Sequence, residues 1–164
     1  RPWLRALPEV RTEPVRPDFW DGSGMVIFVK KDKDVPSLGR IGSFLDKQCF
    51  NGALTKLVAD TGFDASLGSV RVNHVSDKGI QNVILVGVGT PEEDDWKQVG
   101  LAAAEELQKL EGKAALVCID GVQVEELVTG VLKGLAGVGP KTIELLGAFP
   151  AGSGAAIEKA FQAL

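Results

Sequence analysis

The chain has 164 residues, of which 45% are hydrophobic and 24% charged, which suffices for one domain with a core of its own. Its formal net charge of -4 and sequence pI near 5.1 argue against a general nucleic-acid-binding surface. No apolar run approaches the roughly 20 residues that cross a bilayer. The two cysteines favour neither a disulfide framework nor a zinc site.

Residues 1–24 differ in composition from the rest and carry four of the eight prolines and two of the three tryptophans. Proline at this density favours an extended, polyproline-like arm. The large side chains of the arm either pack across the domain or dock onto a partner protein, and tryptophan and arginine are typical of interface hot spots. We expect partner docking, with self-packing as the open alternative. The candidate residues are Trp3, Leu4, Arg5, Leu7, Phe19 and Trp20.

Beyond the arm, apolar runs alternate with segments of helical spacing. Continuous apolar strands between amphipathic helices predict a three-layer α/β/α sandwich around a mixed, largely parallel sheet. The strands at 69–76 and 83–88 are joined too tightly for a crossover, so we expect an antiparallel hairpin with the first strand near an edge. The predicted elements are a strand at 25–30, one or two helices within 37–60 broken near 51–52, strands at 69–76 and 83–88, a helix at 91–110, a strand at 114–119 and a helix at 124–135.

The turn after the strand at 83–88 reads Gly87-Val88-Gly89 and resembles a phosphate-binding turn. The dinucleotide fingerprint needs a third glycine, and Glu92 stands in its place. Thr90 and Pro91 are suited to cap and start the following helix, whose first turn would then hold the four acidic residues 92–95. Carboxylates there repel a phosphate, so we expect no cofactor and no small-molecule ligand at this turn.

Single reactive side chains give no catalytic motif. His74 is expected to be an ordinary strand residue, and Ser153 a loop or helix-start residue, because the sequence around it lacks the outer glycine of a nucleophile elbow. Cys49 and Cys118 are expected to be buried, reduced thiols.

The segment 135–146 resembles a helix-hairpin-helix, in which a Gly-hydrophobic-Gly hairpin precedes a short helix. In that motif hairpin amides and a following lysine hold a DNA phosphate. The matching residues are Gly137, Gly139, Lys141 and Thr142. A proline that starts a helix after a glycine turn explains the same pattern without DNA. The single copy in an acidic chain favours this second interpretation.

Three stretches together are similar to a known family: Met25 to Val29, Ile80 to Thr90, and Glu125 to Gly134. On these residues the segment 25–135 resembles the N-terminal domain of the leucyl aminopeptidase family (cytosol aminopeptidases, peptidase family M17). The resemblance implies a macro-domain-like α/β/α fold. It also implies that the chemistry of the family lies in a separate C-terminal domain with two metal ions, whose motifs this sequence does not contain. We therefore expect no catalytic and no metal-binding residue here.

These observations predict an arm at 1–24, an aminopeptidase N-terminal-like domain at 25–135 and a helical, Gly/Ala-rich tail at 136–164. The expected function is that of a non-catalytic accessory or structural subunit, which docks into a larger protein assembly through its arm and tail. Two alternatives stay open: an N-terminal fragment of a metal-dependent leucyl aminopeptidase, and a phosphate- or DNA-binding module. Because the chain begins at Arg1 and not at Met, we expect either a fragment or a processed mature protein, and removal of a targeting peptide would fit a chloroplast or mitochondrial protein.

Overall fold

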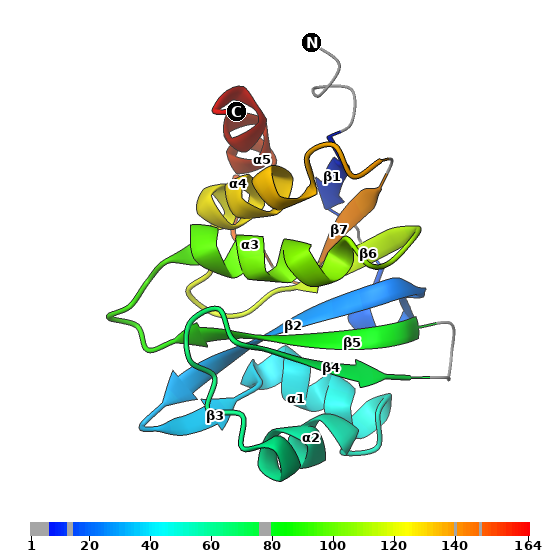
Figure 1. Cartoon of the computed structure of the whole chain (residues 1–164), viewed down its shortest axis with the longest axis vertical. Helices are drawn as coiled ribbons and strands as arrows, with labels where there is room; N and C mark the ends of the chain where they lie inside the picture. Colours follow the sequence, from blue (N-terminus) through cyan, green and yellow to red (C-terminus); the bar gives the residue numbers. More distant parts are fainter. Residues whose placement is uncertain (1–6, 13–14, 76–79, 140, 148) are drawn as a thin grey trace.

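The computed structural model describes residues 7–12, 15–75, 80–139, 141–147 and 149–164. Within these ranges one sheet of seven strands lies between helices on both of its faces (Figure 1). The elements are β1 (Glu9–Thr12), the 3-10 turn η2 (Pro17–Phe19), β2 (Gly22–Asp32), β3 (Val35–Ser37), α1 (Gly39–Gln48), α2 (Ala53–Thr61), β4 (Val70–His74), β5 (Ile80–Gly89), α3 (Trp96–Leu107), β6 (Lys113–Val117), α4 (Val124–Leu135), β7 (Thr142–Leu146) and α5 (Ser153–Gln162).

The sheet has the strand order β1-β7-β6-β2-β5-β4, and β3 pairs with the end of β2. β1, β7, β6, β2 and β5 run parallel, whereas β4 is antiparallel to β5 and β3 antiparallel to β2. The mixed, largely parallel α/β sheet predicted from the sequence is therefore confirmed, and so is the hairpin that places β4 at one end of the strand order.

Both faces of the central strands are buried, as continuous apolar runs require. From β2, Val26 and Phe28 pack in the core beneath α3, α4 and α5, whereas Met25, Ile27 and Val29 pack on the opposite side with α1 and α2. The two helical layers are visible on opposite sides of the sheet in Figure 1.

The break predicted near residues 51–52 is present, and its cause is local. Asn51 and Gly52 both have positive φ values, 54° and 78°, which end α1 and turn the chain into α2. The buried carboxylate of Asp46 then accepts hydrogen bonds from the first amides of α2, Leu54 N at 2.8 Å and Thr55 N at 3.1 Å. One side chain of α1 thereby caps the helix that follows it.

Three predicted boundaries are wrong. Residues 1–24 are not simply an extended arm, because residues 9–12 form β1, which pairs in parallel with β7. The predicted helical tail at 136–164 contains a strand, β7, before its helix α5. The helix expected from Pro91 begins only at Trp96, where Asp95 caps it by accepting a hydrogen bond from Gln98 N at 3.1 Å.

Among the described residues, no helix combines the length and the apolar character needed to cross a membrane.

Candidate functional site

A pocket of about 560 Å³ lies where β2, β5 and the loop after β6 reach the same edge of the sheet. In open α/β sheets this carboxyl edge is the usual place for a ligand. The walls come from the hairpin that joins β2 to β3, from the loop between β5 and α3, and from Asp120 and Gly121. Trp96 contributes from the start of α3, where it is buried and contacts Phe28 edge-on with ring centroids 5.5 Å apart.

The pocket carries charges of both signs. Its lysines are Lys30, Lys31 and Lys33, and its carboxylates are Asp32, Glu92, Asp94 and Asp120. An anion would meet nearby cations together with a larger number of carboxylates. The lysines and the acidic residues after β5 are about 60 residues apart in sequence, and only the pairing of β2 with β5 brings them to one pocket.

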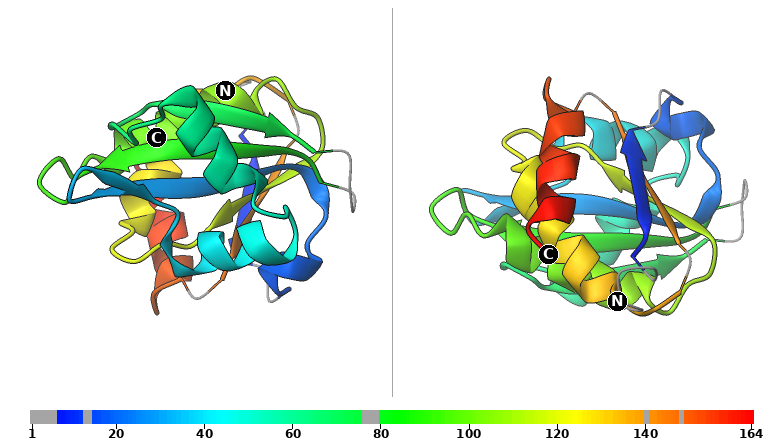
Figure 2. Two further views of the ribbon diagram at one scale, coloured as in Figure 1. Left: turned by 90° about the horizontal axis from the view of Figure 1, so that it is seen from below. Right: turned by 90° about the horizontal axis from the view of Figure 1, so that it is seen from above.

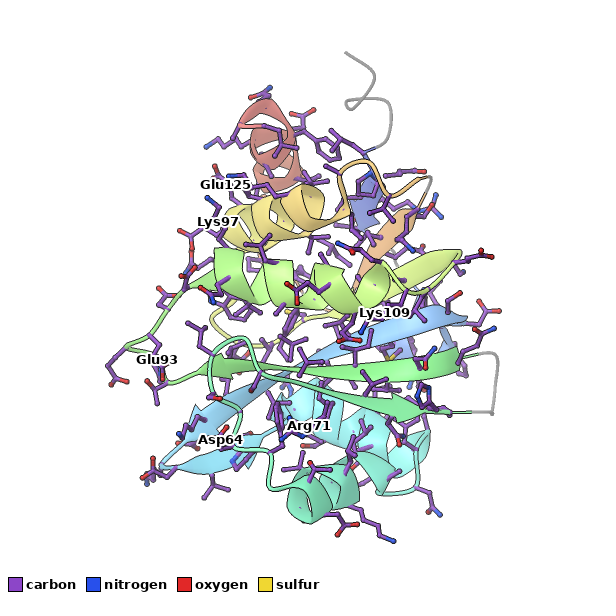
Figure 3. All side chains as sticks on the ribbon, viewed as in Figure 1. Asp64, Arg71, Glu93, Lys97, Lys109 and Glu125 are labelled. Atoms are coloured by element: carbon purple, nitrogen blue, oxygen red, sulfur yellow. The ribbon has the colours of Figure 1, made fainter. Side chains whose placement is uncertain are left out.

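The glycine turn at the end of β5 is already occupied by a carboxylate of the chain. Gly89 has a φ of 69°, which favours glycine, and the backbone amide and hydroxyl of Thr90 both donate to Glu93 Oε1 at 3.2 Å. Figure 3 shows Glu93 on this loop between β5 and α3. The acidic residues thus lie in a loop and not in the first turn of a helix. The amide and the hydroxyl of Thr90 are thus already paired with a carboxylate of the chain.

The other glycine of this turn, Gly87, has a packing role. A Cβ at this position would overlap the carbonyl oxygen of Ser66 and lie 2.6 Å from Ser69 Oγ. Gly87 therefore allows the loop before β4 to pass close to β5.

Both interpretations of the segment 135–146 expected a helix after the glycine turn, and both are wrong. Gly137 and Gly139 do form a turn, with φ values of 80° and 117°, but strand β7 follows it in place of a short helix. Thr142 is the first residue of β7 and pairs with Glu9 of β1. Lys141 is 8% exposed and donates its ammonium group to Leu110 O, and burial lowers the pKa of this lysine. The side chain assigned to a DNA phosphate is thus buried within the domain.

The predicted docking residues separate into distinct groups. Trp3, Leu4 and Arg5 lie outside the described residues. Leu7 is half-buried ahead of β1. Trp20 is 4% exposed and belongs to the core beside α1 and α2. This side chain therefore packs against its own domain, which was the alternative to partner docking. Phe19, its neighbour, is 72% exposed.

Trp20 is fixed by a buried carboxylate that sequence reasoning missed. Glu144, in the middle of β7, is 1% exposed and accepts a hydrogen bond from Trp20 Nε1 at 3.1 Å. Arg11 on β1 and Lys113 on β6 reach the same carboxylate at 3.4 and 3.6 Å. The ammonium group of Lys113 also lies 5.6 Å from the centroid of the Trp20 ring. Glu144 therefore links β1 and the Trp20 segment at the N-terminus to strands β7 and β6.

The remaining reactive side chains, a histidine, a serine and two cysteines, contact neighbouring groups of the fold. His74 Nδ1 lies 2.5 Å from Asn82 Oδ1 across the β4–β5 pair. Ser153 is the first residue of α5, and its hydroxyl donates to Pro150 O at 2.6 Å.

Cys49 and Cys118 are half-buried and so are less buried than predicted. Burial and the nearby carboxylate of Asp120 raise the pKa of the Cys118 thiol. In the part of the chain that the structure describes, no group of three or more His, Cys, Asp or Glu side chains is placed to hold a metal ion.

Comparison of the sequence with known families gives a match of residues 25–135 to the N-terminal domain of the cytosol aminopeptidase family. Comparison with curated proteins gives no match.

Comparison with solved structures gives two kinds of similar fold. A mutant of tomato leucine aminopeptidase superposes with a TM-score of 0.67 at 17% identity, covering 93% of this chain and 35% of that chain. A mutant Oceanobacillus iheyensis macrodomain, in a structure with ADPR, gives a TM-score of 0.62 at 13% identity, covering 94% and 91% of the two chains. The macrodomain of Mycobacterium tuberculosis DarG gives 0.62 at 8% identity, covering 86% and 99%. This chain therefore spans about a third of the aminopeptidase and nearly the whole of each macrodomain.

Proposed function

Because the chain belongs to the cytosol aminopeptidase family through the N-terminal domain of that family, we propose that it is a non-catalytic accessory domain that docks onto the rest of a larger protein assembly. The macro-domain-like fold implied by the sequence resemblance is confirmed. The docking role is the proposal.

One observation carries the proposal. The superposition on tomato leucine aminopeptidase covers 93% of this chain but 35% of that chain. The chain thus corresponds to about a third of that aminopeptidase, and its residues 25–135 match the N-terminal domain of the family. An accessory domain of this kind contributes a surface and leaves catalysis to its neighbour, either in the same polypeptide or in a separate subunit.

The first experiment measures the native mass of the endogenous protein and identifies the polypeptides that copurify with it. We expect a particle well above the 17.3 kDa of this chain, either because the polypeptide continues into a catalytic domain or because other subunits are bound. Intact-mass spectrometry separates these two cases. A native particle of about 17.3 kDa would refute the proposal, and so would hydrolysis of leucine p-nitroanilide by the purified chain with added Mn²⁺ or Zn²⁺.

A second candidate function, binding of a phosphate-bearing nucleotide, is favoured by the pocket at the carboxyl edge. Its volume suits a small ligand, it contains three lysines, and similar folds occur in macrodomain structures with ADPR and with ADP. Glu93 and the carboxylates of the pocket oppose this function, so the docking role remains our main proposal.

Isothermal titration with ADP-ribose and ADP tests this second function directly. If it is correct, Lys31→Ala weakens binding, whereas Lys47→Ala on α1, away from the pocket, leaves binding unchanged. Absence of heat above the dilution control for both nucleotides would remove nucleotide binding as a function.

A further inference from the structure

Two exposed phenylalanines lie on neighbouring elements, η2 and α1, on the face of the sheet that carries α1 and α2. Phe19 of η2 is 72% exposed and Phe44 of α1 is 42% exposed. Figure 2 shows the η2 turn next to α1 in the view from below. We call the surface around them the basic–aromatic face, and its members are Arg16, Phe19, Arg40, Phe44 and Lys47.

The backbone fixes where Phe19 is presented. Its amide donates to Arg16 O at 2.9 Å, and the next residue, Trp20, is buried and bonded to Glu144. The guanidinium group of Arg16 lies 5.1 Å from the centroid of the Phe19 ring and bonds to both carboxylate oxygens of Asp18 at 3.1 and 2.9 Å. Phe19 is therefore an aromatic side chain exposed from an ordered turn, which lowers the entropy cost of binding a partner.

Helix α1 supplies the second half of the face. Gly42 and Leu45 are buried, whereas Arg40, Phe44 and Lys47 are exposed. Positions 40, 44 and 47 are four and three residues apart, so the two cations and the ring share one side of the helix.

A groove of about 330 Å³ lies between the two halves. Pro17, Ile41, Phe44 and Gly147 line it together with Arg16, Asp18 and Arg40. Its surface is therefore mainly apolar, and its charged groups are the Arg16–Asp18 ion pair and Arg40. A large apolar side chain could enter this groove, and carboxylates beside that side chain would lie near Arg40.

The charge of the face is opposite to that of the whole chain. The chain has a formal net charge of -4, yet the face carries Arg16, Arg40 and Lys47. Asp18 is paired with Arg16, so these two residues together add no net charge, and Asp46 is buried and bonded to the backbone of α2. Arg40 and Lys47 are therefore the cations that an approaching partner would meet. An acidic partner would therefore be attracted to this face in particular.

We propose that the basic–aromatic face docks an acidic amphipathic protein segment, which places a large apolar side chain in the groove and carboxylates against Arg40 and Lys47. This inference rests on the proposed accessory role and specifies the chemistry of the partner. A protein segment fits better than a nucleic acid, because an apolar groove with few cations gives a phosphate backbone little to bind.

The test uses the full chain and a synthetic amphipathic helix peptide that carries Phe and Leu on one side and glutamates beside them. We expect the amide signals of η2 and α1 to shift during an NMR titration. Phe44→Ala should weaken binding about tenfold, because a central aromatic contact contributes more than about 1 kcal/mol. Val35→Ala is the matched control, since Val35 is 62% exposed on β3 and lies outside the face. A peptide with lysines in place of the glutamates should not bind.

The same variants in the endogenous assembly separate the two proposals. If the particle forms with the wild-type chain and dissociates with Arg40→Glu or Phe44→Ala, the inference stands. If the particle forms equally with these variants, the face is not the docking site, although the accessory role holds. If the wild-type chain forms no particle, the accessory role itself fails. Tighter binding of single-stranded oligothymidylate than of the acidic peptide, with loss on Arg40→Glu, would overturn the choice of a protein partner.

Discussion

The buried carboxylate of Glu144 gives the sharpest prediction about stability. Glu144→Ala removes the acceptor of the Trp20 indole N–H and leaves a cavity at a position where the native side chain is 1% exposed. An unsatisfied buried donor costs about 1–3 kcal/mol. Arg11 and Lys113 are 50% and 41% exposed, so water can solvate them, and the loss stays below the roughly 3–5 kcal/mol that follows when a charge is left buried. We therefore expect a decrease in the free energy of unfolding of about 2–3 kcal/mol.

Urea denaturation followed by far-UV circular dichroism measures this value, and Trp20→Phe in the same series separates the hydrogen bond from the rest. Glu9→Gln is the matched control, because Glu9 also pairs with Arg11, at 3.6 Å, but is 63% exposed. That surface pair should contribute less than about 1 kcal/mol. If Glu144→Ala costs no more than Glu9→Gln, the carboxylate does not hold the N-terminal segment in place and the reasoning is refuted.

Two further predictions concern helix packing and thiol chemistry. Gly100→Ala should destabilise the fold by about 1–3 kcal/mol, because the new Cβ would overlap Leu127 O of α4. Gly154→Ala in α5, where nothing lies within 4 Å of the new Cβ, should instead stabilise the fold by about 0.5–1 kcal/mol. Thermal denaturation compares the two variants, and equal effects would contradict the close approach of α3 and α4. Asp120→Asn should speed the alkylation of Cys118 by iodoacetamide near neutral pH, because a nearby negative charge raises the thiol pKa and the thiolate is the nucleophile. An unchanged rate, measured by peptide mass spectrometry, would show that Asp120 does not act on the thiol.

Local patterns predicted the centre of this fold because each central element carries its own signal. The apolar run at 83–88 lies within β5, and the amphipathic segment at 124–135 has the bounds of α4. The glycine turn after α1 likewise lies where Asn51 and Gly52 placed it.

The sheet edge made by β1 and β7 could not be predicted in this way, because its stability comes from pairing over a long distance in sequence. Residues 9–12 are mostly exposed and contain two charged residues, so only their register with 142–145 makes them a strand. In β7 the charge of Glu144 interrupts the apolar pattern, and its partners come from β1, β6 and the residue after η2. Pro140 beside the glycines then made a helix start the simpler interpretation.

The candidate site could not be predicted for the same reason, because it depends on contacts between residues far apart in sequence. Charges around Lys30 and around Asp94 were each apparent in the sequence, but the pocket exists only because β2 and β5 are neighbours in the sheet. The exposure of Phe19 beside a buried Trp20 depends on the direction of a short turn, which composition does not specify.

The pairing of β1 with β7 also determines when this domain can be completed during synthesis. Arg11 and Glu144 are 133 residues apart in sequence, so β1 leaves the ribosome long before its partner strand exists. Contacts of such high separation carry a large loop-closure cost and form late. We expect β2, β5 and β6 to assemble first, with the Trp20 segment waiting for Glu144. A nascent chain stalled before residue 142 would then have a protease-sensitive N-terminal segment that becomes protected once β7 has emerged.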